Sequence, residues 1–139
     1  MEQLWWIAHA LVVPAWLALL IRPGPAMTRI ARLVAGALAA GYLVLFLLHA
    51  REASVLARDY SPDGVTLFFA DPALRLVGWV HYLAFDLVVG AWEADEARRL
   101  GLSRALLIVS LFATFLVGPV GFLLFLVLSW NRSRAAPAS

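Results

Sequence analysis

The sequence contains no cysteine and no lysine, and few of its residues carry a charge. The absence of cysteine excludes disulfides, thiolate nucleophiles and thiolate-bound metals. Charged residues make up only 14% of the 139 residues, whereas hydrophobic residues make up 63%. A soluble protein of this size could not bury so many large apolar side chains. The net charge of +2 is too small to favour nucleic acid as a partner. The composition therefore predicts an integral membrane protein.

Long uncharged runs separated by arginine-rich or proline-rich segments predict an all-α fold, a bundle of four transmembrane helices. We place the spans at about 4–21, 33–50, 72–93 and 105–130, in one membrane domain over residues 1–130. A polar tail over 131–139 is expected to be disordered. Asp71 followed by Pro72 has the residue types of an N-cap and a first helical position, so the third helix should begin there.

The fourth run is longer than a membrane requires. Residues 105–130 would form about 39 Å of helix against about 30 Å of hydrocarbon, so we expect tilt and a kink at Gly118-Pro119. Four spans place both termini on one side of the membrane. The acidic start and basic exit of the first span favour the outside, although the arginine distribution between loops barely discriminates.

Two further patterns concern packing and depth. Small residues four apart in the second span predict its packing face, at Gly36 with Ala40 and Ala37 with Gly41. Four-span topology also brings several tryptophans to one membrane interface, as in an aromatic belt: Trp5, Trp6, Trp79 and Trp130.

The third span carries ionisable residues well inside an apolar run. At about 100° per residue, one arc of roughly 140° holds His81, Gly78, Phe85, Val89, Tyr82, Glu93 and Asp86. The opposite side holds Val80, Leu83, Ala84, Leu87, Val88 and Ala91. A charge at membrane depth costs at least about 2.5 kcal/mol. We therefore expect the polar arc to face the other helices and the aliphatic side to face lipid.

The same segment resembles a known family. Residues 79–87 read Trp-Val-His-Tyr-Leu-Ala-Phe-Asp-Leu, followed by Gly90-x-Trp92-Glu93 and later by Gly-Pro-Val-Gly-Phe-Leu-Leu at 118–124. This is similar to the abscisic-acid-deficient-type (neoxanthin-synthase-like) membrane proteins, whose plant pattern is roughly Trp-x-His-x-Leu-Ala-x-Asp-Leu. The similarity covers about residues 1–130 and is most specific over 65–125. It implies a four-helix membrane protein acting on xanthophylls. Without a long targeting extension, the chain looks more like the bacterial branch, in a bacterial inner membrane.

The implied reaction opens an epoxide while a proton leaves a neighbouring polyene carbon, giving an allene. It needs an acid and a base, and it demands neither a redox cofactor nor a metal. The catalytic candidates are His81, Asp86 and Tyr82, since imidazole exchanges protons near neutrality and Tyr82 precedes Asp86 by one helical turn. The candidates for binding a carotenoid or other isoprenoid ligand are Trp79, Phe85, Val89, Glu93 and His49.

Other interpretations of these residues stay open. Asp86 could be neutralised by an arginine or bonded to a helix backbone, and His81 could simply donate to a carbonyl. Glu93 could belong to a solvated helix end, and His49 could be interfacial. The chain could also bind a carotenoid or isoprenoid lipid, or stabilise a partner complex, without turnover. In a third class, His9, His49 and His81 in one leaflet would ligate haem or a metal. Homo-oligomerisation is undecided.

Overall fold

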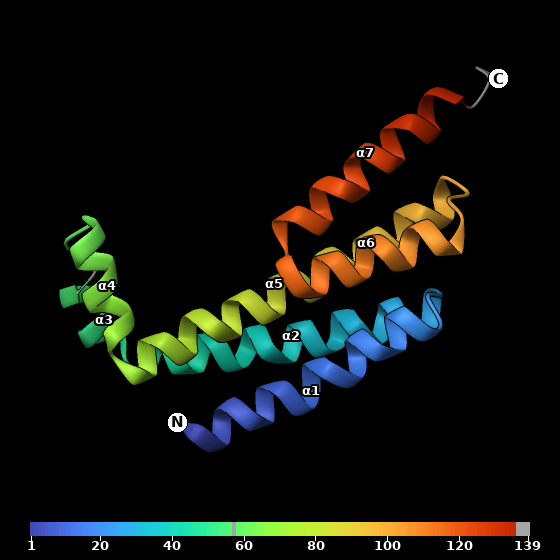
Figure 1. The fold of residues 1–139 in the computed structure, drawn as a ribbon. Helices are drawn as coiled ribbons and strands as arrows, with labels where there is room; N and C mark the ends of the chain where they lie inside the picture. Colours follow the sequence, from blue (N-terminus) through green and yellow to red (C-terminus); the bar gives the residue numbers. More distant parts are fainter. Residues whose placement is uncertain (57, 136–139) are drawn as a thin grey trace.

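The computed structural model describes residues 1–56 and 58–135, and this part of the chain contains helices and no strand (Figure 1). The helices in chain order are α1 (Glu2–Ile21), α2 (Pro25–Leu48), α3 (Ala50–Leu56), α4 (Pro62–Ala70), α5 (Pro72–Arg99), α6 (Arg104–Val117) and α7 (Pro119–Ala135). The predicted all-α class is confirmed. Helix α2 begins eight residues before the expected start of the second span, because Pro25 suits the first helical position.

Three helices in the described part are long and apolar enough to cross a membrane: α1, α2 and α5. Helix α6 has 14 residues, about 21 Å, and falls short of the roughly 30 Å of hydrocarbon. The short helices α3 and α4 lie at the end of the molecule where α2 finishes and α5 begins (Figure 1).

Side-chain caps define where the later helices start. The Asp71 carboxylate accepts hydrogen bonds from the backbone N–H groups of Ala73 (2.8 Å) and Leu74 (3.0 Å), which confirms the predicted start of the third long helix. The Ser61 hydroxyl caps α4 and the Ser103 hydroxyl caps α6 in the same way. Helix α5 then continues to Arg99, beyond the expected end of the span.

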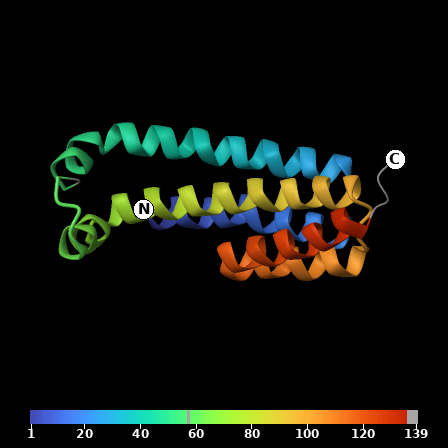
Figure 2. The ribbon, with the colours of Figure 1, turned by 90° about the horizontal axis from the view of Figure 1, so that it is seen from above.

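The fourth apolar run does not form a single span. Helix α6 ends at Val117, the chain reverses at Gly118, and α7 runs back in contact with α6 as a helical hairpin whose two arms diverge away from the turn (Figure 1 and Figure 2). The Arg132 guanidinium donates to the Gly101 carbonyl (3.4 Å), which places the end of α7 at the level of the α5–α6 turn. The expected kinked span over 105–130 is therefore wrong, and the count of four spans is not confirmed.

Two glycines make this reversal sterically feasible. Gly118 has φ +35°, a backbone conformation that an L side chain rarely adopts. At Gly121, a β-carbon would overlap the backbone and hydroxyl of Thr114 on α6, so its missing side chain lets α7 approach α6 closely. Pro119 has no N–H to donate back into α6, which makes it a suitable first residue for a new helix.

The hairpin changes the expected topology. The described C-terminal end of the chain lies at the opposite end of the bundle from the N-terminus (Figure 2). The expectation that both termini share one side is therefore wrong. Trp130 lies near Arg132 at the far end and does not join Trp5 and Trp79. Helix α7 also continues through the first residues of the expected disordered tail to Ala135, and residues 136–139 lie outside the described part.

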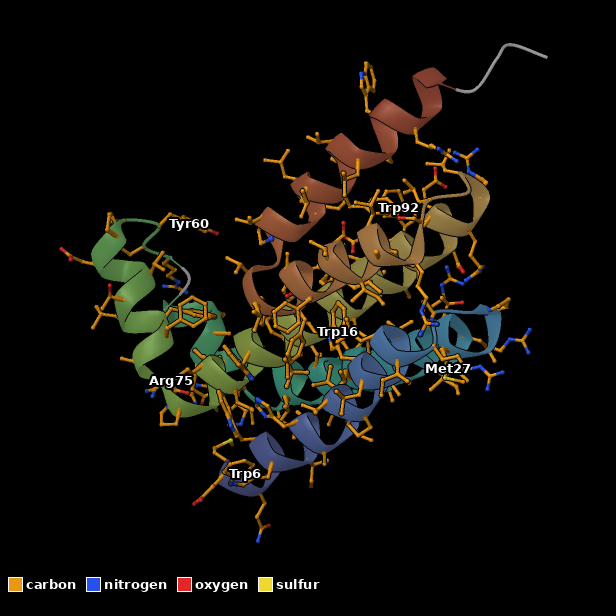
Figure 3. The ribbon with its side chains drawn as sticks, turned by 45° about the vertical axis from the view of Figure 1, so that its right-hand side comes forward. Trp6, Trp16, Met27, Tyr60, Arg75 and Trp92 are labelled. Carbon is orange, nitrogen blue, oxygen red and sulfur yellow. The ribbon has the colours of Figure 1, made fainter. Side chains whose placement is uncertain are left out.

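Helix α5 is the centre of the core, and it packs most extensively against α2. Half of the buried residues of α2 are alanines, Ala31 and Ala35, and small side chains let two helix backbones approach closely. The expected packing face of α2 was wrong: Gly36, Ala40, Ala37 and Gly41 are all exposed. Trp16 lies at the centre of the bundle, whereas Trp6 points outward (Figure 3).

Candidate functional site

The inward face of α5 is not the one predicted from its polarity. Most of the expected lipid side is buried against neighbouring helices, with Val80, Leu83, Ala84, Leu87 and Ala91 in the core. An exposed stripe follows the helix instead, formed by His81, Phe85, Val88 and Trp92. Helix α5 contacts α1, α2 and α6, and the close approach of these helices requires aliphatic and small side chains.

His81 lies on this exposed stripe and points away from the other catalytic candidates. Its ring stacks on Phe85, with centroids 4.5 Å apart, and meets Tyr42 of α2 at 5.7 Å. Phe85 itself is 61% exposed. The expectation that His81 faces the interior beside Asp86 is therefore wrong.

Asp86 does turn toward the protein, at the tip of the α6–α7 hairpin. A β-carbon placed on Gly118 would lie 3.1 Å from Oδ1 and 3.2 Å from Oδ2, so the carboxylate rests against the turn. Its Oδ2 atom is buried without a hydrogen-bond partner among the described residues. The Tyr82 side chain, one helical turn earlier, interacts with the same carboxylate. These two catalytic candidates are thus brought together, as their spacing predicts.

A second carboxyl group lies deeper in the same interface. Glu93 is fully buried, and its Oε1 accepts a hydrogen bond from the Thr114 hydroxyl of α6 at 2.8 Å. Its Oε2 and the Ser110 hydroxyl are buried without partners in the described part of the chain. Glu93 therefore does not belong to a solvated helix end. It holds α5 against α6.

Sequence reasoning missed the residues that α6 and the hairpin contribute: Ser110, Thr114 and Gly118. A signal was present, because Ser110 and Thr114 stand four residues apart in an otherwise apolar run. Glu93 also follows Asp86 by two helical turns, on the same side of α5.

Aromatic rings extend from Tyr82 toward the N-terminal end of α1. Trp79 packs on Tyr82 (centroids 5.3 Å apart) and stacks on Trp5 (4.9 Å). Its indole N–H donates to Nε2 of His9 at 3.3 Å. Nδ1 of His9 lies 2.7 Å from the Trp5 carbonyl, so the hydrogen-bond network places a ring proton on Nδ1. Both ring nitrogens of His9 are thus used.

The remaining candidates lie at the edge of this region or outside it. Val89 is partly buried, three residues beyond Asp86. His49 caps the end of α2, seven residues beyond Tyr42, which is about 10 Å of helix. It does not reach the Asp86 region. The described residues contain no group of three side chains that could hold a metal, so the three histidines do not converge.

The family model described as ABA DEFICIENT 4-like matches residues 3–125. The chain belongs to the ABA DEFICIENT 4-like family. It is therefore a membrane protein related to neoxanthin synthase. No curated protein and no solved structure matches the chain. The matched segment of this family member includes Tyr82, Asp86, Glu93, Thr114 and Gly118, and it reaches into α7.

Proposed function

We propose that this ABA DEFICIENT 4-like protein modifies a carotenoid or a closely related isoprenoid lipid by acid–base proton transfer at Asp86. The observation that carries the proposal is the Asp86 carboxylate, which has one buried oxygen without a partner among the described residues and lies beside the Tyr82 side chain. A carboxylate at membrane depth is expensive and commonly marks a functional site. The family supports a carotenoid as the substrate.

The pair has the two groups that an epoxide-opening isomerisation needs. The Tyr82 hydroxyl donates its proton to the epoxide oxygen as the carbon–oxygen bond breaks. The Asp86 carboxylate accepts the proton that leaves the neighbouring polyene carbon, and the new double bond completes the allene. Asp86 then returns its proton to the Tyr82 oxygen across their contact. The sequence of steps conserves atoms and electrons, so Tyr82 takes the role expected for His81.

The surroundings of the pair suit an apolar, elongated ligand. The α6–α7 hairpin lies along only part of α5, and its turn stops at Asp86 (Figure 2). Beyond the turn, Trp79 and Tyr82 are only partly buried. A polyene entering from the bilayer would lie against these rings, because flat conjugated chains pack well on aromatic faces.

The test is conversion of an epoxy-carotenoid by purified protein in lipid nanodiscs. We expect a product of unchanged mass whose absorption moves to shorter wavelength, because an allene shortens the conjugated chain. Asp86→Asn and Tyr82→Phe should lose this activity at least about 100-fold, the usual worth of a positioned acid or base. His81→Ala is the matched control and should retain it, because His81 points outward.

Three results would contradict the proposal. The wild-type protein could convert no epoxy-carotenoid, or His81→Ala could abolish turnover while Asp86→Asn keeps it. Pigment that binds and is recovered unchanged would instead identify a carotenoid-binding protein without turnover.

We further infer that the arginine-rich end of the bundle faces the cytoplasm of a bacterial inner membrane. With α7 folded back, eight of the eleven arginines lie at this end: Arg22, Arg29, Arg32, Arg98, Arg99, Arg104, Arg132 and Arg134. Only Arg51, Arg58 and Arg75 lie at the other end. Arginine and lysine are enriched on the cytoplasmic side of membrane proteins. This orientation places the N-terminus outside and the end of α7 inside.

A further inference from the structure

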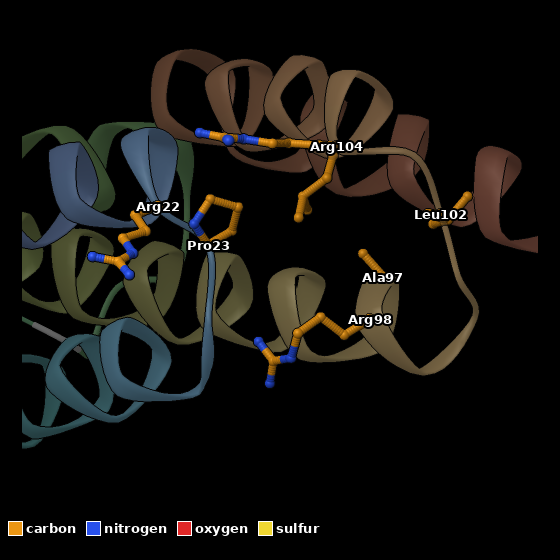
Figure 4. A pocket seen from close by; sticks show the side chains of 7 residues that line it. Arg22, Pro23, Ala97, Arg98, Leu102 and Arg104 are labelled. Atoms are coloured by element: carbon orange, nitrogen blue, oxygen red, sulfur yellow. The ribbon is translucent and has the colours of Figure 1, made fainter.

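A cavity of about 180 Å³ opens where α1 ends, α5 ends and α6 begins (Figure 4). Three of its lining residues are arginines and the others are apolar: Arg22, Arg98, Arg104, Pro23, Ala97, Leu102 and Leu107. Among the described residues, none of those that line it is acidic. A water molecule accounts for about 30 Å³ of liquid, so the cavity is large enough for a polyatomic group.

The positive charge around the cavity is incompletely neutralised. Arg98 pairs with Asp95, but the same carboxylate also pairs with Arg32 of α2. Arg104 donates to the Ile21 carbonyl at the end of α1 and forms no ion pair within the described residues. Arg22 is exposed and likewise forms no ion pair there. A guanidinium carries five N–H donors, so several remain available.

We propose that this cavity binds the phosphate of an anionic phospholipid. Guanidinium groups match phosphate geometry and form charge-assisted hydrogen bonds with it. The cavity lies at the ends of helices that span the membrane, which is the depth of lipid headgroups. Its leucines, alanine and proline suit the glycerol linkage and the first acyl carbons. A zwitterionic lipid would add a cation to a site that already holds three, so the anionic class is favoured.

A bound lipid would also connect three separate elements of the fold. The three arginines come from the end of α1, the last turn of α5 and the first residue of α6. A phosphate between them would join the long helices to the start of the hairpin. Binding to the folded state alone raises stability in proportion to the logarithm of ligand concentration.

Thermal unfolding of the purified full chain in neutral detergent, with added phosphatidylglycerol, tests the proposal. Matched arms contain phosphatidylcholine or glycerol 3-phosphate. We expect stabilisation by phosphatidylglycerol alone, and at least about tenfold weaker apparent affinity in Arg22→Gln, since a bond to a charged group is worth about 1.5–3 kcal/mol. Arg29→Gln is the control, because it removes one exposed arginine from the same end without touching the cavity.

Arg22→Gln is the decisive variant because Arg104 also holds the Ile21 carbonyl, so replacing Arg104 could weaken the fold itself. Equal losses in Arg22→Gln and Arg29→Gln would overturn the proposal in favour of general surface charge. Equal stabilisation by phosphatidylcholine would overturn the preference for anionic lipid. Equal stabilisation by glycerol 3-phosphate would show a site for soluble phosphate, and unchanged affinity in Arg22→Gln would remove the cavity from consideration.

Discussion

Replacing Gly118 by alanine tests the chain reversal on which the site depends. Gly118 has φ +35° and ψ −93°, outside the regions that alanine favours, and backbone strain of this kind costs about 1–3 kcal/mol. The new methyl group would also lie 3.1 Å from Oδ1 of Asp86, a crowded contact of the kind that costs about 1–3 kcal/mol in packed interiors. The Asp86 side chain can move and relieve part of this contact. We therefore expect Gly118→Ala to lower the free energy of unfolding by about 2–4 kcal/mol in total.

Two other glycines separate these contributions. Gly101 has φ +62°, and no described atom lies within 4 Å of a β-carbon placed on it, so Gly101→Ala should show only the backbone cost, about 1–2 kcal/mol. Gly36 lies inside α2 with a negative φ, and no described atom lies within 4 Å of a β-carbon placed on it, so Gly36→Ala should leave stability unchanged or raise it by about 0.5–1 kcal/mol. Unfolding in mixed micelles, followed by tryptophan fluorescence, measures all three variants.

A double-mutant cycle isolates the contact with the carboxylate. Asp86→Ala removes the crowded atoms, so in its presence Gly118→Ala should cost about 1 kcal/mol less. The reasoning is refuted if Gly118→Ala lowers the free energy of unfolding no more than Gly101→Ala does, and if this loss is the same with and without Asp86→Ala. That pair of results would favour a continuous, kinked span through Gly118.

Two further predictions concern the buried carboxyl group and the orientation. Thr114→Val should lower the free energy of unfolding by about 1–3 kcal/mol in the same assay, because the buried Glu93 carboxyl group is left without its hydrogen-bond donor. Adding Glu93→Leu should recover part of that loss. If Thr114→Val leaves stability unchanged, the hydrogen bond between Thr114 and Glu93 contributes nothing. Because the chain has no cysteine, Gln3→Cys and Ser133→Cys provide single labelling sites. A membrane-impermeant maleimide should label the first in intact spheroplasts and the second only after permeabilisation, and equal labelling would contradict opposite termini.

The helical class and the start of α5 were predictable because they depend on local chemistry. A chain with so many apolar residues must satisfy its backbone within helices when it enters a bilayer. Asp71 and Pro72 supply a cap and a preset φ whatever the tertiary structure. The pairing of Tyr82 with Asp86 follows equally from their spacing on one helix.

The orientation of α5 and the hairpin were not predictable for a physical reason. In water a helix must bury its apolar side, but in a bilayer both lipid and protein are apolar, so periodicity reveals two faces without saying which is inward. His81 is tolerated outside beside Tyr42 and Phe85, whereas Val80 and Leu87 pack inside. Similarly, Gly118-Pro119 indicates a break in a helix but does not set its angle. Close packing of Gly121 on Thr114 decides that.

The hairpin extends along only part of the bundle. Within the described chain, α6 and α7 pack beside the long helices toward the arginine-rich end, and beyond the α6–α7 turn the long helices α1, α2 and α5 continue without them. In a bilayer, acyl chains would occupy the space beside the long helices that the hairpin does not reach, so lipid packing there would bear directly on the turn that supports Asp86.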